Sequence, residues 1–171
     1  MKHSKGETVV YGGSGVCQID DIRDISFYHE RPQKYYVLKP LFVKQSQTVY
    51  VPMNNEKLTA KIQPVISREE ALELIHGIND NDVEWIEDRN LRKDTFNDLV
   101  MGGNRKAIIN VITVIINKRR DLLAEGKTLN MQDEKILAEA ERRMNAEFAI
   151  ALDLKIEEVE DFIQEESKKA G

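Results

Sequence analysis

The chain has 171 residues and a net charge of −5. This length accommodates one ordinary domain or two small ones, and the acidic balance argues against a general nucleic-acid-binding protein, which is usually basic. Because Cys17 is the single cysteine, an intrachain disulfide is excluded. No stretch reaches the roughly 18 apolar residues of a membrane span, and the opening residues lack the apolar core of a signal peptide. We therefore expect a soluble, cytoplasmic protein.

Residues 1–64 have the alternation and turn signals of short β-strands. Strands are expected at residues 7–11, 16–19, 33–40 and 47–52, and residues 22–27 either continue the second strand or begin another. Several short strands separated by turns predict a small, strongly bent antiparallel sheet or barrel. We expect only a short connection after it, because the composition changes between Val51 and Ser67.

From Ser67 onward the apolar residues follow a helical period. Ser67 and Glu70 form a capping box, in which the serine oxygen accepts the Glu70 amide and the glutamate reaches back to the Ser67 N–H. The periodicity predicts a helix that begins after Ser67 and ends near residues 77–80, a second at about 91–101, a third that Asn104 caps and that runs to about 125, and two more at about 131–152 and 156–169. The chain is therefore expected to be an α+β protein, with a β domain at 1–64 and an all-α bundle of about five helices at 65–171.

The segment from Ala107 to Ile116 is dense in β-branched residues, which favour strands. We nevertheless predict a helix there. A glycine pair and a capping asparagine precede the segment, and a run of basic residues follows it, as suits a helix C-terminal half. A helix that is apolar on most sides is expected at the centre of the bundle.

The sequence offers no recognisable catalytic motif. The glycine-rich residues 12–15 lack the lysine of a phosphate-binding loop and precede a strand rather than a helix. The three histidines have no neighbours at metal-ligand spacing, and Cys17 lies in an alternating strand, where a small core residue is expected. We therefore predict a protein that is not an enzyme and that uses no metal or cofactor.

The sole tryptophan, Trp85, lies in a polar connection between two helices. It either packs this connection onto the bundle or forms a surface aromatic wedge for a partner. Residues 86–120 contain eight basic and four acidic residues, a local charge of +4 in an acidic chain. This charge is either an ordinary helix surface or, with the aromatic ring, a site for DNA: cations neutralise phosphates, and the ring stacks where bases have parted.

The segments GETVVYGGSGV at 6–16, YVLK at 36–39 and VYVP at 49–52 resemble the CarD/CdnL family of bacterial transcription regulators. The first part of the chain resembles the polymerase-interacting domain that this family shares with transcription-repair coupling factors, a Tudor-like bent sheet. The later tryptophan, the glycine pair at 102–103 and the order of helices resemble the second domain of the family.

This resemblance implies a transcription regulator that binds the β subunit of RNA polymerase and stabilises the opened promoter. The strand expected to pair with the polymerase consists of Val49, Tyr50, Val51 and Pro52, and Tyr50 stands where some relatives carry arginine. Trp85 matches the family's wedge, which enters the minor groove at the upstream edge of the melted DNA. The cations expected to contact DNA are Arg89, Arg92, Lys93, Arg119 and Arg120.

A rival interpretation uses the same sheet in a different kind of protein. In it, the chain is a docking adaptor of the elongation or repair type, and its helical domain binds protein rather than DNA. The two interpretations differ in whether Trp85 is exposed beside cations or buried in the bundle.

Overall fold

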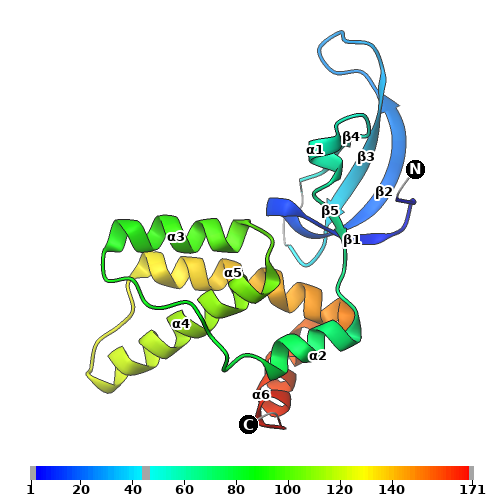
Figure 1. Cartoon of the computed structure of the whole chain (residues 1–171). Helices are drawn as coiled ribbons and strands as arrows, with labels where there is room; N and C mark the ends of the chain where they lie inside the picture. The colour runs from blue at the N-terminus through cyan, green and yellow to red at the C-terminus, as the bar shows by residue number, and fades with distance from the viewer. Residues whose placement is uncertain (1–2, 44–46, 170–171) are drawn as a thin grey trace. The chain divides into compact units, whose positions relative to one another are not determined.

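The computed structural model of the chain describes residues 3–43 and 47–169. Its internal contacts divide the chain into two compact units, Met1–Val65 and Ile66–Gly171. Within the described residues, the first unit holds an antiparallel sheet, a 3-10 turn at Gly12–Ser14 and one short α-helix, and the second holds helices only (Figure 1). The α+β class predicted from the sequence is confirmed.

The sheet has five antiparallel strands in the part of the chain that the structure describes, in the order β4-β3-β2-β1-β5. They are β1 Thr8–Tyr11, β2 Gly15–Ile25, β3 Gln33–Pro40, β4 Val49–Pro52 and β5 Ile62–Pro64. Residues 22–25 therefore continue the second strand rather than begin another. A register shift between Ile19 and Asp21 marks a β-bulge in β2. A bulge bends and twists its strand, so this single long strand can serve a curved sheet (Figure 1).

The stretch between β4 and the helical unit differs from the expected plain connection. Asn55 accepts the Leu58 amide at 3.1 Å and caps the short helix α1, Glu56–Thr59. β5 then pairs with β1 and completes the sheet. Sequence patterns did not indicate β5 because it has only three residues, one of them proline, and a single buried side chain, Ile62.

The core of the first unit lies on one face of this sheet. It contains Val9, Cys17, Ile19, Tyr36, Leu38, Val51 and Ile62. Cys17 is fully buried, as predicted for a small core residue.

The helical unit contains α2 Arg68–His76, α3 Arg89–Met101, α4 Arg105–Ala124, α5 Met131–Ala151 and α6 Val159–Lys169, with a 3-10 turn Ile156–Glu158 before α6. The predicted start and stop signals are largely confirmed. Ser67 and Asn104 accept the amides of Glu70 and Ala107 at 3.1 and 3.0 Å. Gly126, which follows α4, has φ 72°, the left-handed conformation typical of a helix C-terminus. The second bond of the capping box differs from the prediction. The Glu70 carboxylate accepts a hydrogen bond from the Ser67 hydroxyl at 3.2 Å, whereas the backbone N–H of Ser67 had been expected as the donor.

The β-branched segment is helical, as predicted, but α4 is not the central helix. α4 packs on α3 and α5, whereas α5 packs on α2, α3, α4 and α6. α5 can approach several neighbours closely because it buries Ala140, Ala146 and Ala149 among its larger apolar residues. Ile116, on α4, remains 37% exposed.

α5 also buries charged groups that tie other parts of the unit to it. Glu147 is 3% exposed, and its two carboxylate oxygens both lie 2.8 Å from Nε of Arg105, near the start of α4. The same carboxylate accepts the backbone N–H of Ile66 at 2.9 Å. The first residue of the helical unit is thereby bonded to its interior.

Candidate functional site

Strand β4, which contains all four residues expected at the polymerase contact, lies at an edge of the sheet. The Met53 amide donates to the Lys34 carbonyl at 2.9 Å. Because backbone direction alternates along an antiparallel strand, Val51 and Val49 also turn their N–H and C=O groups toward β3. Tyr50 therefore turns its N–H and C=O away from the sheet. These two groups are the ones that a further strand could pair with.

Pro52 marks the end of this free edge. It belongs to the same outward-facing set as Tyr50 but has no N–H to donate. Its carbonyl accepts the Asn55 amide at 3.2 Å, within the turn that leads into α1. A strand that pairs with this edge can therefore bond to the backbone of Tyr50 and of residues that precede it. It finds no N–H donor at residue 52.

The two faces of β4 differ in character. The Val51 side chain is fully buried in the core of the sheet unit, whereas Tyr50 is 40% exposed on the opposite face. The Tyr50 ring lies edge-on to Phe27 with centroids 5.5 Å apart, and Phe27 lies edge-on to Tyr35 at 5.3 Å. Partly exposed aromatic side chains therefore adjoin the free edge, and such side chains are enriched in protein interfaces.

Trp85 lies in the connection between α2 and α3, which is held in place along its length. Lys106, on α4, donates to the Gly77 carbonyl at 2.6 Å. Asn81 donates to the Asn110 carbonyl at 3.1 Å and accepts the Val83 amide at 2.8 Å. Asp88 closes the connection by capping α3 through the Leu91 amide at 2.9 Å. The connection therefore has a defined path across α4 although it lacks regular secondary structure.

The Trp85 side chain is half-buried. It has features of both interpretations of the sequence, a residue packed on the bundle and a surface aromatic beside cations. It packs against the hydrophobic core of the helical unit, with its ring 6.2 Å from that of Phe96. Two cations also lie over the indole, the Arg92 guanidinium at 4.3 Å and the Lys118 ammonium at 5.5 Å from the ring centroid. Such cation–π contacts fix the position of an aromatic ring as well as bringing positive charge to it.

Arg92 is buried, and most of its hydrogen-bond donors are engaged. It is 6% exposed, and its partner Asp133, on α5, is 2% exposed. The guanidinium donates to both Asp133 oxygens at 3.0 and 2.9 Å, and to the carbonyls of Ile86 and Glu87 at 2.8 and 3.2 Å. Four of its five donors are thus engaged beside the tryptophan. The structure leaves Arg92 little capacity for the phosphate contact expected of it.

The other expected cations are more accessible. Arg89 and Lys93, on α3, are exposed and make no ion pair with any residue that the structure describes. Arg119 lies 3.4 Å from Glu134, and Arg120 lies 4.0 Å from its neighbour Asp121, both as solvent-exposed pairs. Pairs of this kind are weak, so both side chains can exchange partners.

Lys118 and Asp133 belong to the tryptophan site but were not singled out in the sequence. Lys118 was one of the basic residues of the +4 segment, and nothing in its spacing marked it above its neighbours. Asp133 looked like an ordinary charge in the first turn of a helix. A bond between residues 41 positions apart depends on how α3 lies on α5, which no local pattern encodes.

The described residues contain no group of three or more His, Cys, Asp or Glu arranged to hold a metal ion. In the same part of the chain, none of the helices combines the length and the apolar character needed to cross a bilayer.

Comparison with known families bears on the sheet unit. Residues 3–66 match the family model of the CarD-like/TRCF RID domain. The matched range contains all five strands of the sheet and stops before α2. No curated protein is similar enough to the chain to count as a match.

Proposed function

We propose, from the premise that residues 3–66 form a CarD-like/TRCF RID domain, that the protein binds the β subunit of RNA polymerase and stabilises the opened promoter. The RID domain is a protein-interaction domain, not a catalytic one, and it supports an interaction with RNA polymerase in transcription. The observation that carries the proposal is this family match together with the free edge of β4. A protein with this role acts in the cytoplasm and needs no catalytic activity.

The polymerase contact is best explained as β-augmentation, in which a strand of the partner extends the sheet. Tyr50 offers one N–H and one C=O to such a strand, and Pro52 ends the ladder. The backbone bonds provide affinity that depends little on side-chain identity. The half-exposed rings of Tyr50 and Phe27 add an apolar surface beside the pairing strand.

The DNA contact is assigned to the connection that carries Trp85. The Trp85 ring is partly exposed, and Lys118 brings positive charge to it. In this proposal Trp85 enters the minor groove at the upstream edge of the bubble, where base pairs have parted. Lys118, Arg89 and Lys93 contact phosphates, with Arg119 and Arg120 farther along the same basic segment.

Arg92 has a different part in this proposal from the one expected from the sequence. Its guanidinium is committed to Asp133 and to two carbonyls of the connection. We assign it the role of positioning residue, which holds the indole and the backbone around it in one arrangement. A wedge fixed in advance loses less conformational entropy on binding than a mobile one.

The net charge of the chain agrees with a protein in which the sheet unit binds the polymerase and the helical unit makes a weaker contact with DNA. An acidic protein with a small basic segment binds free DNA weakly. Once the sheet unit is attached to the polymerase, the promoter is present at high effective concentration, so a weak contact suffices. Contacts available only in the opened state shift the equilibrium toward it, tenfold for each ~1.4 kcal/mol of preference.

The test is the lifetime of the open complex on a fluorescent promoter fragment, measured with no added protein, with the wild type and with Trp85→Ala. We expect the wild type to lengthen the lifetime and Trp85→Ala to lose ~1–3 kcal/mol of that stabilisation, since stacking-like contacts have this size, while polymerase binding is kept. Leu123→Ala, which truncates an exposed residue of α4, is the matched control.

Two other results would redirect the proposal. If wild type binds the polymerase but leaves the lifetime unchanged on several promoters, the protein is a docking adaptor whose helical unit binds protein. The packing of Trp85 on the core of that unit favours this second function. If the wild type does not bind the polymerase at all, the assignment of β4 is wrong as well.

A further inference from the structure

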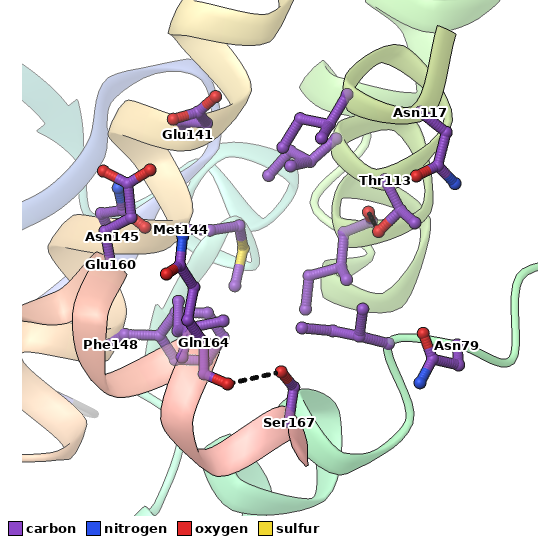
Figure 2. A pocket seen from close by; sticks show the side chains of 15 residues that line it. Asn79, Thr113, Asn117, Glu141, Met144, Asn145, Phe148, Glu160, Gln164 and Ser167 are labelled. Atoms are coloured by element: carbon purple, nitrogen blue, oxygen red, sulfur yellow. Dashed lines mark hydrogen bonds between the residues drawn. The ribbon is translucent and has the colours of Figure 1, made fainter. Parts of the chain in front are cut away.

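A pocket lies in the helical unit and is lined neither by the edge strand nor by Trp85, although Ile78 and Asn79, at the start of the connection that carries Trp85, form part of it. α4 packs on α3 and α5, and α6 packs on α2 and α5. α4 and α6 thus lean on the same helix without packing extensively on each other, and a cavity of about 310 Å³ remains between them. Figure 2 shows α4 on one side, α5 and α6 on the other, and the residues that follow α2 at the base.

The inner wall of this pocket is apolar. It is lined by Ile78, Ile109, Ile112, Ile116, Met144, Phe148 and Ile163. A volume of about 300 Å³ is at the lower end of small-molecule sites, which are mostly apolar with a few placed polar groups. The wall therefore suits a compact hydrocarbon body.

One side of the pocket is negatively charged. Glu141, on α5, and Glu160, on α6, lie on the same wall (Figure 2). Neither carboxylate makes a hydrogen bond or ion pair with a residue that the structure describes, although Glu141 is half-buried. Burial raises the pKa of Glu141, the charge of Glu160 raises it further and that of Glu134 adds to this, while Arg119 on α4 opposes them. A positive charge between the two glutamates would relieve this repulsion.

Amide groups complete the pocket. Asn117 lies on the side of α4, and Asn145 and Gln164 lie on the opposite side, on α5 and α6 (Figure 2). Their side-chain amides have no hydrogen-bond partner within the described part of the chain, whereas the hydroxyls of Thr113 and Ser167 are bonded to helix carbonyls. The amides are therefore available to accept hydrogen bonds from an ammonium group or to orient a ligand.

We infer that this pocket binds a small organic cation, an amine with a compact apolar body. The hydrocarbon part lies against the isoleucine wall, and the ammonium lies between Glu141 and Glu160. The acidic wall selects positive over neutral and negative ligands of the same shape. This site is separate from polymerase and promoter binding and does not depend on the function proposed above.

The experiment compares three probes that share one body and differ in charge: phenylbutylamine, phenylbutanol and phenylbutyrate. Calorimetry or amide chemical shifts of the full-length protein would report their affinities. We expect the amine to bind most tightly, the alcohol less tightly and the acid least. Affinity for the amine should rise with pH as Glu141 loses its proton, given the surrounding charges of Glu160, Glu134 and Arg119.

Variants localise the binding. Glu141→Gln should weaken the amine by about tenfold or more, because it removes a charge-assisted contact, and should leave the alcohol unchanged. Glu157→Gln makes the same change at an exposed glutamate outside the pocket and should have no effect. Ile116→Trp fills the pocket from its exposed edge and should abolish binding of all three probes with an unchanged circular dichroism spectrum.

Several outcomes would overturn the inference. Equal affinity for the three probes, or no binding up to millimolar concentration, would do so. Binding of the amine that Ile116→Trp leaves intact would place it elsewhere on the surface. If the protein forms dimers that Ile116→Trp disrupts, the pocket is covered by a second copy of the chain and not by a small cation.

Discussion

The edge strand β4 and the Trp85 connection are both proposed contact sites, but they are built on different physical grounds. β4 presents backbone groups, whose direction follows from strand register and from the bond between Met53 and Lys34. The Trp85 connection has no regular structure and is defined by side chains from three helices. Recognition through backbone tolerates sequence change, whereas recognition through a held side chain depends on each member of its network. The sheet site should therefore be robust to substitution, and the tryptophan site fragile.

The largest expected effect concerns the buried ion pair beneath Trp85. Asp133→Ala leaves the Arg92 guanidinium buried without its carboxylate, which should lower the free energy of unfolding of the helical unit by ~3–5 kcal/mol. Glu134→Ala, one residue later, removes an exposed pair with Arg119 and should cost less than ~1 kcal/mol. Urea denaturation followed by tryptophan fluorescence measures both. Similar costs for the two variants would contradict the fragility of this site.

The next effect tests whether the edge of β4 acts through its backbone. Tyr50→Pro removes the outward N–H of residue 50 but keeps the bonds of Val49 and Val51 to β3. It should weaken binding to the isolated polymerase β lobe by ~1 kcal/mol relative to Tyr50→Ala, the worth of one hydrogen bond. Tyr50→Ala provides the control for loss of the ring. Indistinguishable affinities of the two variants would show that no strand pairs at this residue.

A smaller effect separates the cation beside the indole from one farther along the helix. Lys118→Ala removes an ammonium that lies over Trp85. It should destabilise the open complex by ~0.5–1 kcal/mol, the range of exposed cation–π contacts, and so shorten its lifetime. Arg120→Ala changes a side chain that is 72% exposed beside Asp121 and should have less effect. Lifetimes at several salt concentrations would measure both. A larger loss for Arg120→Ala would move the DNA contact away from the tryptophan.

The smallest effect concerns stability and pH in the helical unit. Burial and the charge of Glu160 raise the pKa of Glu141, so the folded protein favours the protonated carboxyl. The resulting stabilisation is complete below the unfolded-state pKa and is lost as pH rises through the folded pKa. Glu141→Gln should therefore raise the free energy of unfolding at neutral pH, and with it the melting temperature. The gain should be less than ~1 kcal/mol because the group is partly exposed, and it should be absent at acidic pH. Melting curves of wild type and variant at both pH values provide the test, and a pH-independent difference would contradict it.

The sequence predicted those parts of the fold that depend on neighbouring residues. Caps such as Ser67 and Asn104 and the terminal Gly126 act within a few positions, so the limits of the helices were largely recognisable. The β-branched run in α4 was assigned to a helix because its flanking residues outweighed its propensity. Elements fixed by distant contacts were missed or misplaced: β5 exists because Ile62 completes a core, and α5 is central because small residues permit close packing.

In the candidate sites, too, local features were recognisable in the sequence and features that depend on distant contacts were not. Strand β4, which the family resemblance singled out, lies at an edge of the sheet, but no residue pattern in the sequence shows which strand is at the edge, and its role in binding stays a prediction. Trp85 was recognisable by its unusual place in a polar connection. The burial of Arg92 was not, because a charged residue on a predicted helix surface gives no sign of a carboxylate on another helix. Residue type indicated where a contact could be made, and tertiary packing decided which cations were available for it.

The hydrogen bond from the Ile66 amide to Glu147 determines where a stable fragment of the helical unit can begin. The amide of residue 66 is one of the donors that satisfy a carboxylate in the interior of the helical unit. A fragment that starts at Ser67 would leave this carboxylate with a missing donor, although it would retain every helix of the unit. A fragment that starts a few residues earlier would keep the peptide amide in place. The autonomy of the helical half therefore depends on a residue that belongs to none of its helices.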